Sequence, residues 1–255
     1  MAFDVAADAY DRFMGRYSRY LSPQMADLAG VGAGSGQRVL DVGCGPGALT
    51  AVLVDRLGAD AVAAVDPSPP FVEAIRARQP GVEVHQASAD ALPFADGAFD
   101  ATLAQLVVHF MPDPVAGLAE MRRVTRVGGV VAACTWDLAG GRAPLSPFWR
   151  AARDLFDDVE DESRRPGVRE GHLVELFATV GLRDITDTAL AVEVEHPTFE
   201  EWWQPYEEGV GPAGVYVAAL SDADRVALRE RCRTQMPEPP FTLTSYAWAA
   251  RGVVA

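Results

Sequence analysis

The amino-acid sequence predicts an α/β fold: a doubly wound, mostly parallel sheet of seven strands with helices on both faces. The first observation behind this prediction is that short apolar segments alternate with segments of helical periodicity between residues 37 and 137. The second is a glycine-rich turn, residues 43–47, between the first of these strands and the first helix. A strand, a glycine turn and a helix in this order are typical of a nucleotide-type ligand site at the carboxyl edge of the sheet.

Seven segments have the length and composition expected of strands. They cover residues 39–42, 61–65, 82–84, 99–107, 130–135, 182–194 and 241–251. Residues that favour the start of a helix precede helical segments at Ser68, Asp113, Thr198 and Ser221. Prolines follow Ser68 and Asp113 directly, in the first helical turn where the missing N–H costs nothing. Strands and helices therefore alternate as the crossovers of a parallel sheet require.

The chain has 255 residues, enough for one large α/β domain, and we predict a single domain over residues 1–255. Residues 1–36 form an N-terminal helical cap ahead of the sheet, and residues 37–137 form the binding core. Helical insertions after the fifth and sixth strands, residues 138–172 and 197–240, are expected on the substrate side.

The charge balance argues against a nucleic-acid partner. Twenty-two Lys and Arg residues stand against 36 Asp and Glu residues, a formal net charge of −14. Because affinity for nucleic acids rests largely on cationic contacts to phosphates, an RNA or DNA substrate is not expected. The sequence gives no indication of the oligomeric state.

Other features predict a cytoplasmic protein without a membrane span. No run of about 18 apolar residues is present, and the N-terminus lacks the basic and apolar regions of a secretory signal. The three cysteines, Cys44, Cys134 and Cys232, are widely scattered. They form neither a disulfide framework nor a metal-binding spacing, so no metal site is predicted.

The glycine spacing alone leaves two ligand classes open, since Gly43, Gly45 and Ala48 also satisfy the looser dinucleotide fingerprint. Acidic residues then follow a regular series. Asp41 precedes the turn and Asp66 closes the second strand, while Asp90 follows the third. A further strand starts at residue 99, and a Val-Gly-Gly turn at 127–129 precedes another.

This series resembles the class I S-adenosylmethionine-dependent methyltransferases, in particular the small-molecule group related to the ubiquinone and menaquinone biosynthesis enzymes. The resemblance implies a Rossmann-like sheet, S-adenosylmethionine as cofactor and S-adenosylhomocysteine as product. It covers residues 37–137 with specific motifs and continues more loosely to the C-terminus.

Each part of the cofactor needs its own partner. Asp66 is placed to accept the ribose hydroxyls, and the resemblance assigns the adenine amino group to Asp90. The resemblance also implies cofactor contacts along the glycine turn, after the second and third strands, and through backbone groups after the fourth: Gly43, Cys44, Gly45, Gly47, Pro67, Ala89, Ala91, Gln105 and Leu106. For Asp41 two roles stay open, holding the methionine ammonium or ordering the amides of the turn.

The N-terminal cap is predicted to contain a helix over residues 6–21. Its aromatic and apolar residues Tyr10, Phe13, Met14 and Tyr17 form one stripe at helical spacing. The stripe fits simple packing on the domain. The resemblance adds a second interpretation, in which Tyr10, Arg16 and Tyr17 lie over the cofactor, with the guanidinium near the methionine carboxylate.

The substrate side contains one candidate base and several aromatic residues. His109 follows the fourth strand on the cofactor side and is the candidate catalytic base if the acceptor is a hydroxyl. Trp136, Trp149 and Trp202 belong to an aromatic group beyond the fifth strand, and together with His109 they are expected to line an apolar substrate pocket.

The sequence therefore predicts a methyltransferase that transfers a methyl group, by in-line displacement, to a small apolar or aromatic metabolite. Alignment and exclusion of water supply most of the catalysis in such a reaction, so no catalytic signature is required. Two alternatives stay open: an NAD-dependent oxidoreductase of Rossmann type and a catalytically silent protein that binds S-adenosylmethionine.

Overall fold

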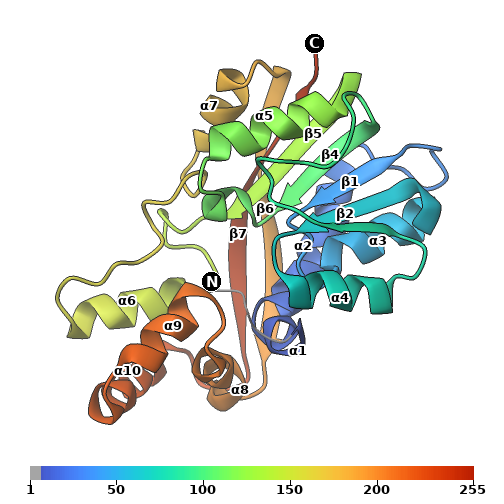
Figure 1. Ribbon diagram of the computed structural model, residues 1–255. Helices are drawn as coiled ribbons and strands as arrows, with labels where there is room; N and C mark the ends of the chain where they lie inside the picture. The colour runs from blue at the N-terminus through green and yellow to red at the C-terminus, as the bar shows by residue number, and fades with distance from the viewer. Residues whose placement is uncertain (1–6) are drawn as a thin grey trace.

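The computed structural model describes residues 7–255 and contains one seven-stranded sheet (Figure 1). The strands are β1 (Val39–Val42), β2 (Val62–Asp66), β3 (Glu83–Gln86), β4 (Phe99–Gln105), β5 (Thr125–Trp136), β6 (Arg183–His196) and β7 (Phe241–Val253). Their order is β3-β2-β1-β4-β5-β7-β6. Strands β1 to β5 pair in parallel, and β7 runs antiparallel to both of its neighbours. The predicted Rossmann-like, mostly parallel sheet is confirmed.

The strand order reverses between β1 and β4, which makes this the point where a ligand crevice is expected at the carboxyl edge. Strands β1 and β2 are buried along their whole length, as expected for parallel strands covered on both faces. Because β7 runs in the opposite direction, its first residue, Phe241, lies at the same edge as His196, the last residue of β6. The carboxyl ends of β4 and β5 meet at this edge as well.

Ten α-helices lie within residues 7–255 (Figure 1). They are α1 (Ala7–Tyr10), α2 (Arg16–Leu28), α3 (Ala48–Leu57), α4 (Pro69–Arg78), α5 (Pro114–Val124), α6 (Ser146–Leu155), α7 (His172–Thr179), α8 (Phe199–Trp203), α9 (Gly211–Ala219) and α10 (Asp222–Gln235). Helices α2, α3 and α4 cover one face of the sheet, while α5 and α7 cover the other. None of these helices is long and apolar enough to cross a membrane.

The N-terminal helix is longer than predicted and changes its winding. Residue 6, where the predicted helix starts, lies outside the described residues. Helix α1 passes into a π-helical segment, η1 (Asp11–Gly15), and then into α2, which ends at Leu28 and not at residue 21. Phe13, Met14 and Tyr17 of the predicted stripe are buried in the same core as Leu21 and Met25, so the apolar face continues along the longer helix.

The predicted helix starts are correct in position. Asp113 accepts hydrogen bonds from the N–H groups of Val115 and Ala116, both at 3.0 Å. Thr198 and Ser221 cap α8 and α10 in the same way. Strand β5 begins at Thr125, five residues earlier than predicted, because Thr125 pairs with Phe99 before the register shifts. The helical insertions after the fifth and sixth strands are present as α6 and as α8 to α10.

Candidate active site

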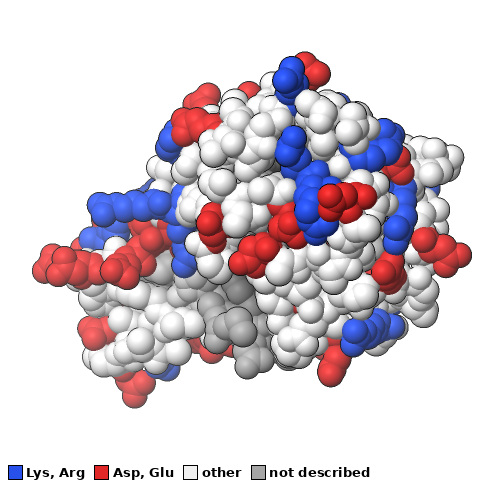
Figure 2. Space-filling view, turned by 45° about the horizontal axis from the view of Figure 1, so that its top comes forward, with Lys and Arg blue, Asp and Glu red and all other residues white. Residues whose placement is uncertain are grey.

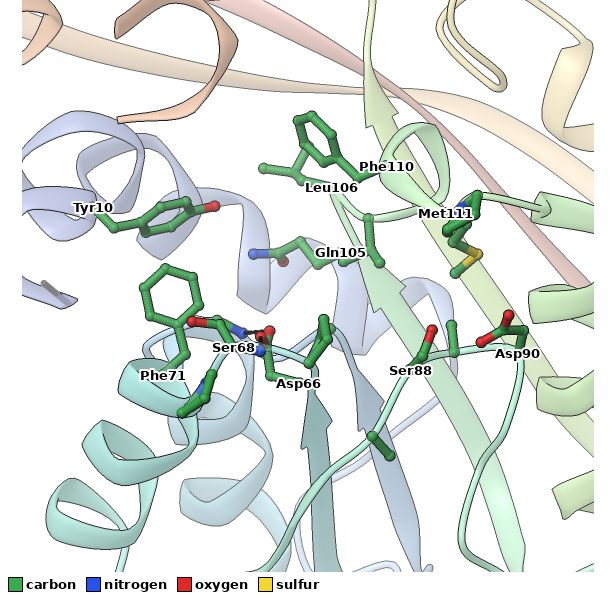
Figure 3. A pocket seen from close by; sticks show the side chains of 18 of the residues that line it. Tyr10, Asp66, Ser68, Phe71, Ser88, Asp90, Gln105, Leu106, Phe110 and Met111 are labelled. Carbon is green, nitrogen blue, oxygen red and sulfur yellow. Dashed lines mark hydrogen bonds between the residues drawn. The ribbon is translucent and has the colours of Figure 1, made fainter. Parts of the chain in front are cut away.

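A cavity of about 490 Å³ opens at the carboxyl ends of β1, β2 and β4 (Figure 3). Its lining consists of Tyr10, Gly43, Gly45, Asp66, Pro67, Ser68, Pro69, Phe71, Ala87, Ser88, Ala89, Asp90, Gln105, Leu106, Val107, Phe110, Met111, Pro112 and Asp113. In Figure 3, Asp66 and Ser68 face Leu106 and Phe110 across the cavity, and Tyr10 lies at the end opposite Asp90 and Met111. The cavity therefore occupies the crevice where the strand order reverses.

The glycine turn brings main chain to the cavity. Gly43 and Gly45 have φ angles of 69° and 53°, in the left-handed region that favours glycine. The N–H groups of Gly43 and Cys44 both bond to the carbonyl oxygen of Val65. A Cβ atom on Gly43 would lie 2.5 Å from a methyl carbon of Val107, so any larger residue here must displace this cavity-lining side chain.

Asp66 anchors the turn and still faces the cavity. Its carboxylate accepts the N–H of Gly45 at 2.9 Å and the N–H of Ser68 at 2.8 Å. Burial raises the pKa of Asp66, and these two hydrogen bonds counteract the increase. Each carboxylate oxygen has two lone pairs, so both can accept a ligand hydroxyl as well. The anchoring role and the predicted ribose-binding role are therefore compatible.

Loop residues after β2 and β3 form the adjoining walls. Pro67 and Ala89 line the cavity, and Asp90 is an exposed acid at its rim beside Met111. Ala91 is exposed and does not line the cavity. The structure thus brings Asp66 and Asp90 to the same cavity with apolar side chains between them, which suits an adenosine.

The end of β4 supplies a buried acceptor and a strained residue. The side-chain amide of Gln105 donates from Nε2 to the Ser22 hydroxyl at 3.0 Å, while its buried Oε1 accepts no hydrogen bond from the residues that the structure describes. Since buried polar atoms are normally hydrogen-bonded, this oxygen indicates a donor that arrives with a ligand. Leu106 follows with φ of 62°, a region rarely adopted by leucine and often found at functional sites.

Tyr10 joins the N-terminal segment to the cavity. It lines the cavity and packs edge-on against Phe71, with ring centroids 5.4 Å apart. Ion pairs hold this segment on two sides: Arg78 of α4 lies 2.8 Å from Asp8 and 2.7 Å from Asp11, and Arg12 lies 2.7 Å from Glu208. The segment therefore bridges the core and the second insertion.

Three residues of β1 and the glycine turn that were candidates for cofactor contact do not line the cavity. Cys44 and Gly47 do not line the cavity, and Gly47, with φ of 104°, provides the entry to α3. Asp41 is 1% exposed, and its Oδ2 accepts the hydroxyl of Thr50 at 2.7 Å. Burial raises the pKa of Asp41 to about 7. Asp41 thus ties β1 to α3, and its two predicted roles stay predictions.

Arg16, Tyr17 and Trp202 lie around a second, much smaller cavity. Its lining consists of Phe13, Arg16, Tyr17, Leu145, His196, Trp202, Pro205 and Tyr206. Trp136 lies edge-on to Tyr17 at 6.2 Å, and the indole of Trp149 donates to buried Glu162 at 3.3 Å. The structure therefore does not bring these predicted residues into the lining of the large cavity.

His109 is also outside the lining of the large cavity, although the next residue, Phe110, belongs to it. His109 is 5% exposed, and its Nδ1 has no hydrogen-bond partner within residues 7–255. Burial, with a smaller contribution from the positive charge of Arg165, lowers the pKa of His109 to about 3. A base with such a low pKa takes up protons poorly at neutral pH.

The sequence prediction missed part of the lining. Phe71 belongs to the helix after β2, Ala87 and Ser88 follow β3, and residues 110–113 follow β4. Their positions after strand ends are a usable signal, because all carboxyl ends of parallel strands meet at one edge. Within residues 7–255, no group of three or more His, Cys, Asp or Glu side chains is arranged to hold a metal ion.

Comparisons with known proteins agree with this geometry. A family model described as a methyltransferase domain matches residues 40–133. A malonyl-[acyl-carrier protein] O-methyltransferase of Pseudescherichia vulneris is 37% identical over 153 residues, which are 59% of this chain and 57% of that protein. An uncharacterized methyltransferase of Mycobacterium sp. (strain JLS) is 40% identical over 203 residues, 75% of this chain and 79% of the relative.

Solved structures share the fold. The YcgJ protein of Bacillus subtilis aligns with a TM-score of 0.57 at 19% identity, covering 91% of this chain and 97% of that one. A geranyl diphosphate C-methyltransferase from Streptomyces coelicolor A3(2), solved with S-adenosylhomocysteine, aligns with a TM-score of 0.54 at 18% identity, covering 92% and 78%. These findings set aside the NAD-dependent alternative. The chain belongs to the class I S-adenosylmethionine-dependent methyltransferases.

Proposed function

We propose that this methyltransferase acts on a small, apolar or aromatic metabolite. The observation that carries this proposal is the aromatic layer on the substrate side of the sheet edge. Phe148 stacks on Tyr206 at 4.6 Å with an angle of 6°, and Trp202 lies 5.0 Å from Tyr206. These rings are buried, and Trp202 and Tyr206 line the small cavity, so the surroundings there are apolar and aromatic, which suits a ligand of the same character.

The large cavity supports a division of roles among its residues. Asp66 would accept the ribose hydroxyls, Asp90 the adenine amino group, and the Gln105 Oε1 atom the methionine ammonium. S-adenosylmethionine supplies the methyl group as part of a sulfonium. Tyr10, Leu106 and Phe110 would keep water out and hold the acceptor close, which is the main requirement for direct transfer.

Two further observations concern the class of substrate and the cellular compartment. On the face seen in Figure 2, acidic and basic side chains are interspersed, and no continuous basic surface is visible there. This pattern supports a small molecule over a nucleic acid. The three cysteines are buried and not in disulfides, which supports a reducing, cytoplasmic setting.

A labelling experiment tests the proposed function. The protein is incubated with S-adenosylmethionine carrying a tritiated methyl group and a panel of phenols, quinols and carboxylic acids. Turnover should produce S-adenosylhomocysteine together with label in an organic extract. Label that appears only in added RNA or protein would contradict the proposal. Tight S-adenosylhomocysteine binding without turnover on any acceptor would favour the catalytically silent alternative.

The N-terminal segment should close over the cofactor. Because Tyr10 lines the cavity and ion pairs hold its helix on two sides, bound S-adenosylhomocysteine should slow amide exchange of residues 10–16 at least about tenfold. Hydrogen exchange with mass-spectrometric detection measures this, and α7 on the opposite face serves as the internal control. Equal exchange with and without ligand would leave the segment only a packing role.

His109 should stay neutral throughout the physiological range. Its lowered pKa predicts no titration of the imidazole between pH 8 and 5. Since the unfolded chain takes up this proton near pH 6.5, His109 should make the fold less stable as the pH falls below that value. NMR titration of the histidine resonances, assigned with His109→Gln, checks this. A midpoint near 6.5 would restore His109 as a candidate base.

A further inference from the structure

The small cavity beside the aromatic layer is formed by three separate parts of the chain. Arg16 and Tyr17 come from the start of α2, His196 from the end of β6, and Trp202 and Tyr206 from the second insertion. The cavity measures about 10 Å³ and accommodates about one atom the size of a water oxygen. It belongs to neither the glycine turn nor the large cavity described above.

Trp202 lines this cavity, and its indole N–H is buried without an acceptor among residues 7–255. The Trp202 residue is 3% exposed. Leaving a buried donor unsatisfied costs free energy, so such groups call for an acceptor from outside the chain. The observation therefore indicates a ligand atom that accepts hydrogen bonds.

The hydrogen bonds around His196 add a second donor. Arg16 Nη1 lies 3.3 Å from His196 Nδ1, and a guanidinium only donates, so Nδ1 is the unprotonated nitrogen. His196 Nε2 then carries the hydrogen and donates to the Tyr17 hydroxyl oxygen at 3.1 Å. The proton of the Tyr17 hydroxyl is left to donate elsewhere. Within this network, donors outnumber acceptors.

Arg16 carries the positive charge of the subsite. Its side chain is 16% exposed, donates from Nη1 to the main-chain oxygen of Glu201 at 3.3 Å, and pairs at 3.7 Å with the Glu201 carboxylate, on a side chain that is 47% exposed and therefore screened by water. His196 adds no charge of its own at neutral pH, because burial and the nearby Arg16 lower its pKa to about 4. A substrate ammonium would be repelled here, whereas an anionic oxygen would be attracted.

We propose that Arg16, Tyr17 and Trp202 form a subsite that binds one carboxylate oxygen of the methyl acceptor, with His196 holding Arg16 and Tyr17 in place. The proposal rests on the proposed function and deepens it by giving the acceptor an acidic end. Tyr10 lines the large cavity and Tyr17 the small one, seven residues further along the same helical segment. An acceptor that reaches both cavities is elongated, with its acidic end remote from the atom that receives the methyl group.

The test uses protein saturated with S-adenosylhomocysteine and three matched probes: 3-phenylpropanoate, 3-phenylpropanamide and 3-phenylpropylamine. Tryptophan indole resonances are followed by NMR in protein labelled with nitrogen-15. The carboxylate should shift the Trp202 resonance, and its affinity should exceed that of the amine at least about tenfold. Trp202→Phe and Arg16→Gln should each weaken carboxylate binding about ten- to hundredfold.

Trp248→Phe is the matched control, since the indole N–H of Trp248 is also buried and finds no acceptor among the described residues, while Trp248 lines neither cavity. It should leave carboxylate affinity unchanged. Equal affinity for amine and carboxylate, an unshifted Trp202 resonance, or the same loss in Trp248→Phe would overturn the proposal and leave the cavity with a buried water only. Calorimetry with S-adenosylhomocysteine distinguishes failure of the proposed function from failure of the subsite. No binding of S-adenosylhomocysteine would count against the proposed cofactor residues. Binding of S-adenosylhomocysteine without binding of the carboxylate would count against the subsite alone.

Discussion

Asp66→Ala should weaken the binding of S-adenosylhomocysteine by about 2–4 kcal/mol, roughly 30- to 1000-fold, because hydrogen bonds to a charged acceptor are worth about 1.5–3 kcal/mol each. The substitution removes the proposed ribose acceptors. It also removes the bonds that hold the N–H groups of Gly45 and Ser68 at the cavity. Isothermal calorimetry on the folded variants measures the loss.

The control is Asp55→Ala, which removes an exposed carboxylate of α3 that does not line the cavity. Asp66→Asn helps to separate the loss of ribose binding from the loss of the bonds to the turn, since the asparagine side chain keeps one oxygen acceptor. An affinity of Asp66→Ala within threefold of wild type would place the ribose elsewhere.

Asp41 should make the stability of the fold depend on pH. Its folded-state pKa of about 7 lies well above the ordinary aspartate value of 3.8, so between these values the folded chain holds a proton that the unfolded chain has released. This contribution to stability is complete below about pH 4 and is lost as the pH rises through about 7. The total is about 4 kcal/mol at 1.36 kcal/mol for each pKa unit.

Asp41→Asn has no such proton, and its side-chain oxygen can still accept the Thr50 hydroxyl. The stability of wild type relative to Asp41→Asn should therefore fall by about 4 kcal/mol between pH 4 and pH 8. Urea unfolding at several pH values measures the difference, with Asp55→Asn as an exposed control. Parallel curves for wild type and Asp41→Asn would show that Asp41 is ionised in the folded state.

Local signals explain why the fold could be predicted. The glycine turn, the apolar runs of β1 and β2, and the caps at Asp113 and Thr198 act within a few residues of one another. Element ends were harder to place. Helix α2 continues to Leu28 because its buried face packs on α3 and β6, and that contact is not visible in the local pattern.

The site was predictable only where it follows strand ends. Asp66 and Gln105 at the ends of β2 and β4, and Asp90 after β3, line the cavity as expected from these places. The partner of Arg16 and Tyr17 was not predictable, since His196 lies about 180 residues away and reaches them only through the pairing of β6 with β7. His109 shows the same limit: position after β4 does not tell which side of the chain a side chain takes.

The lengths of the last two strands have a consequence for how this enzyme could diverge. Strands β6 and β7 have 14 and 13 residues, against four or five in β1 to β3, and they extend beyond the parallel strands toward α8 to α10 (Figure 1). The match to the family model ends at residue 133, within β5 and before β6 begins. The residues that match the family can therefore stay constant in evolution while β6, β7 and α8 to α10 accumulate substitutions. Grafting residues 138–172 and 197–240 from a relative should exchange the accepted substrate and leave cofactor affinity nearly constant.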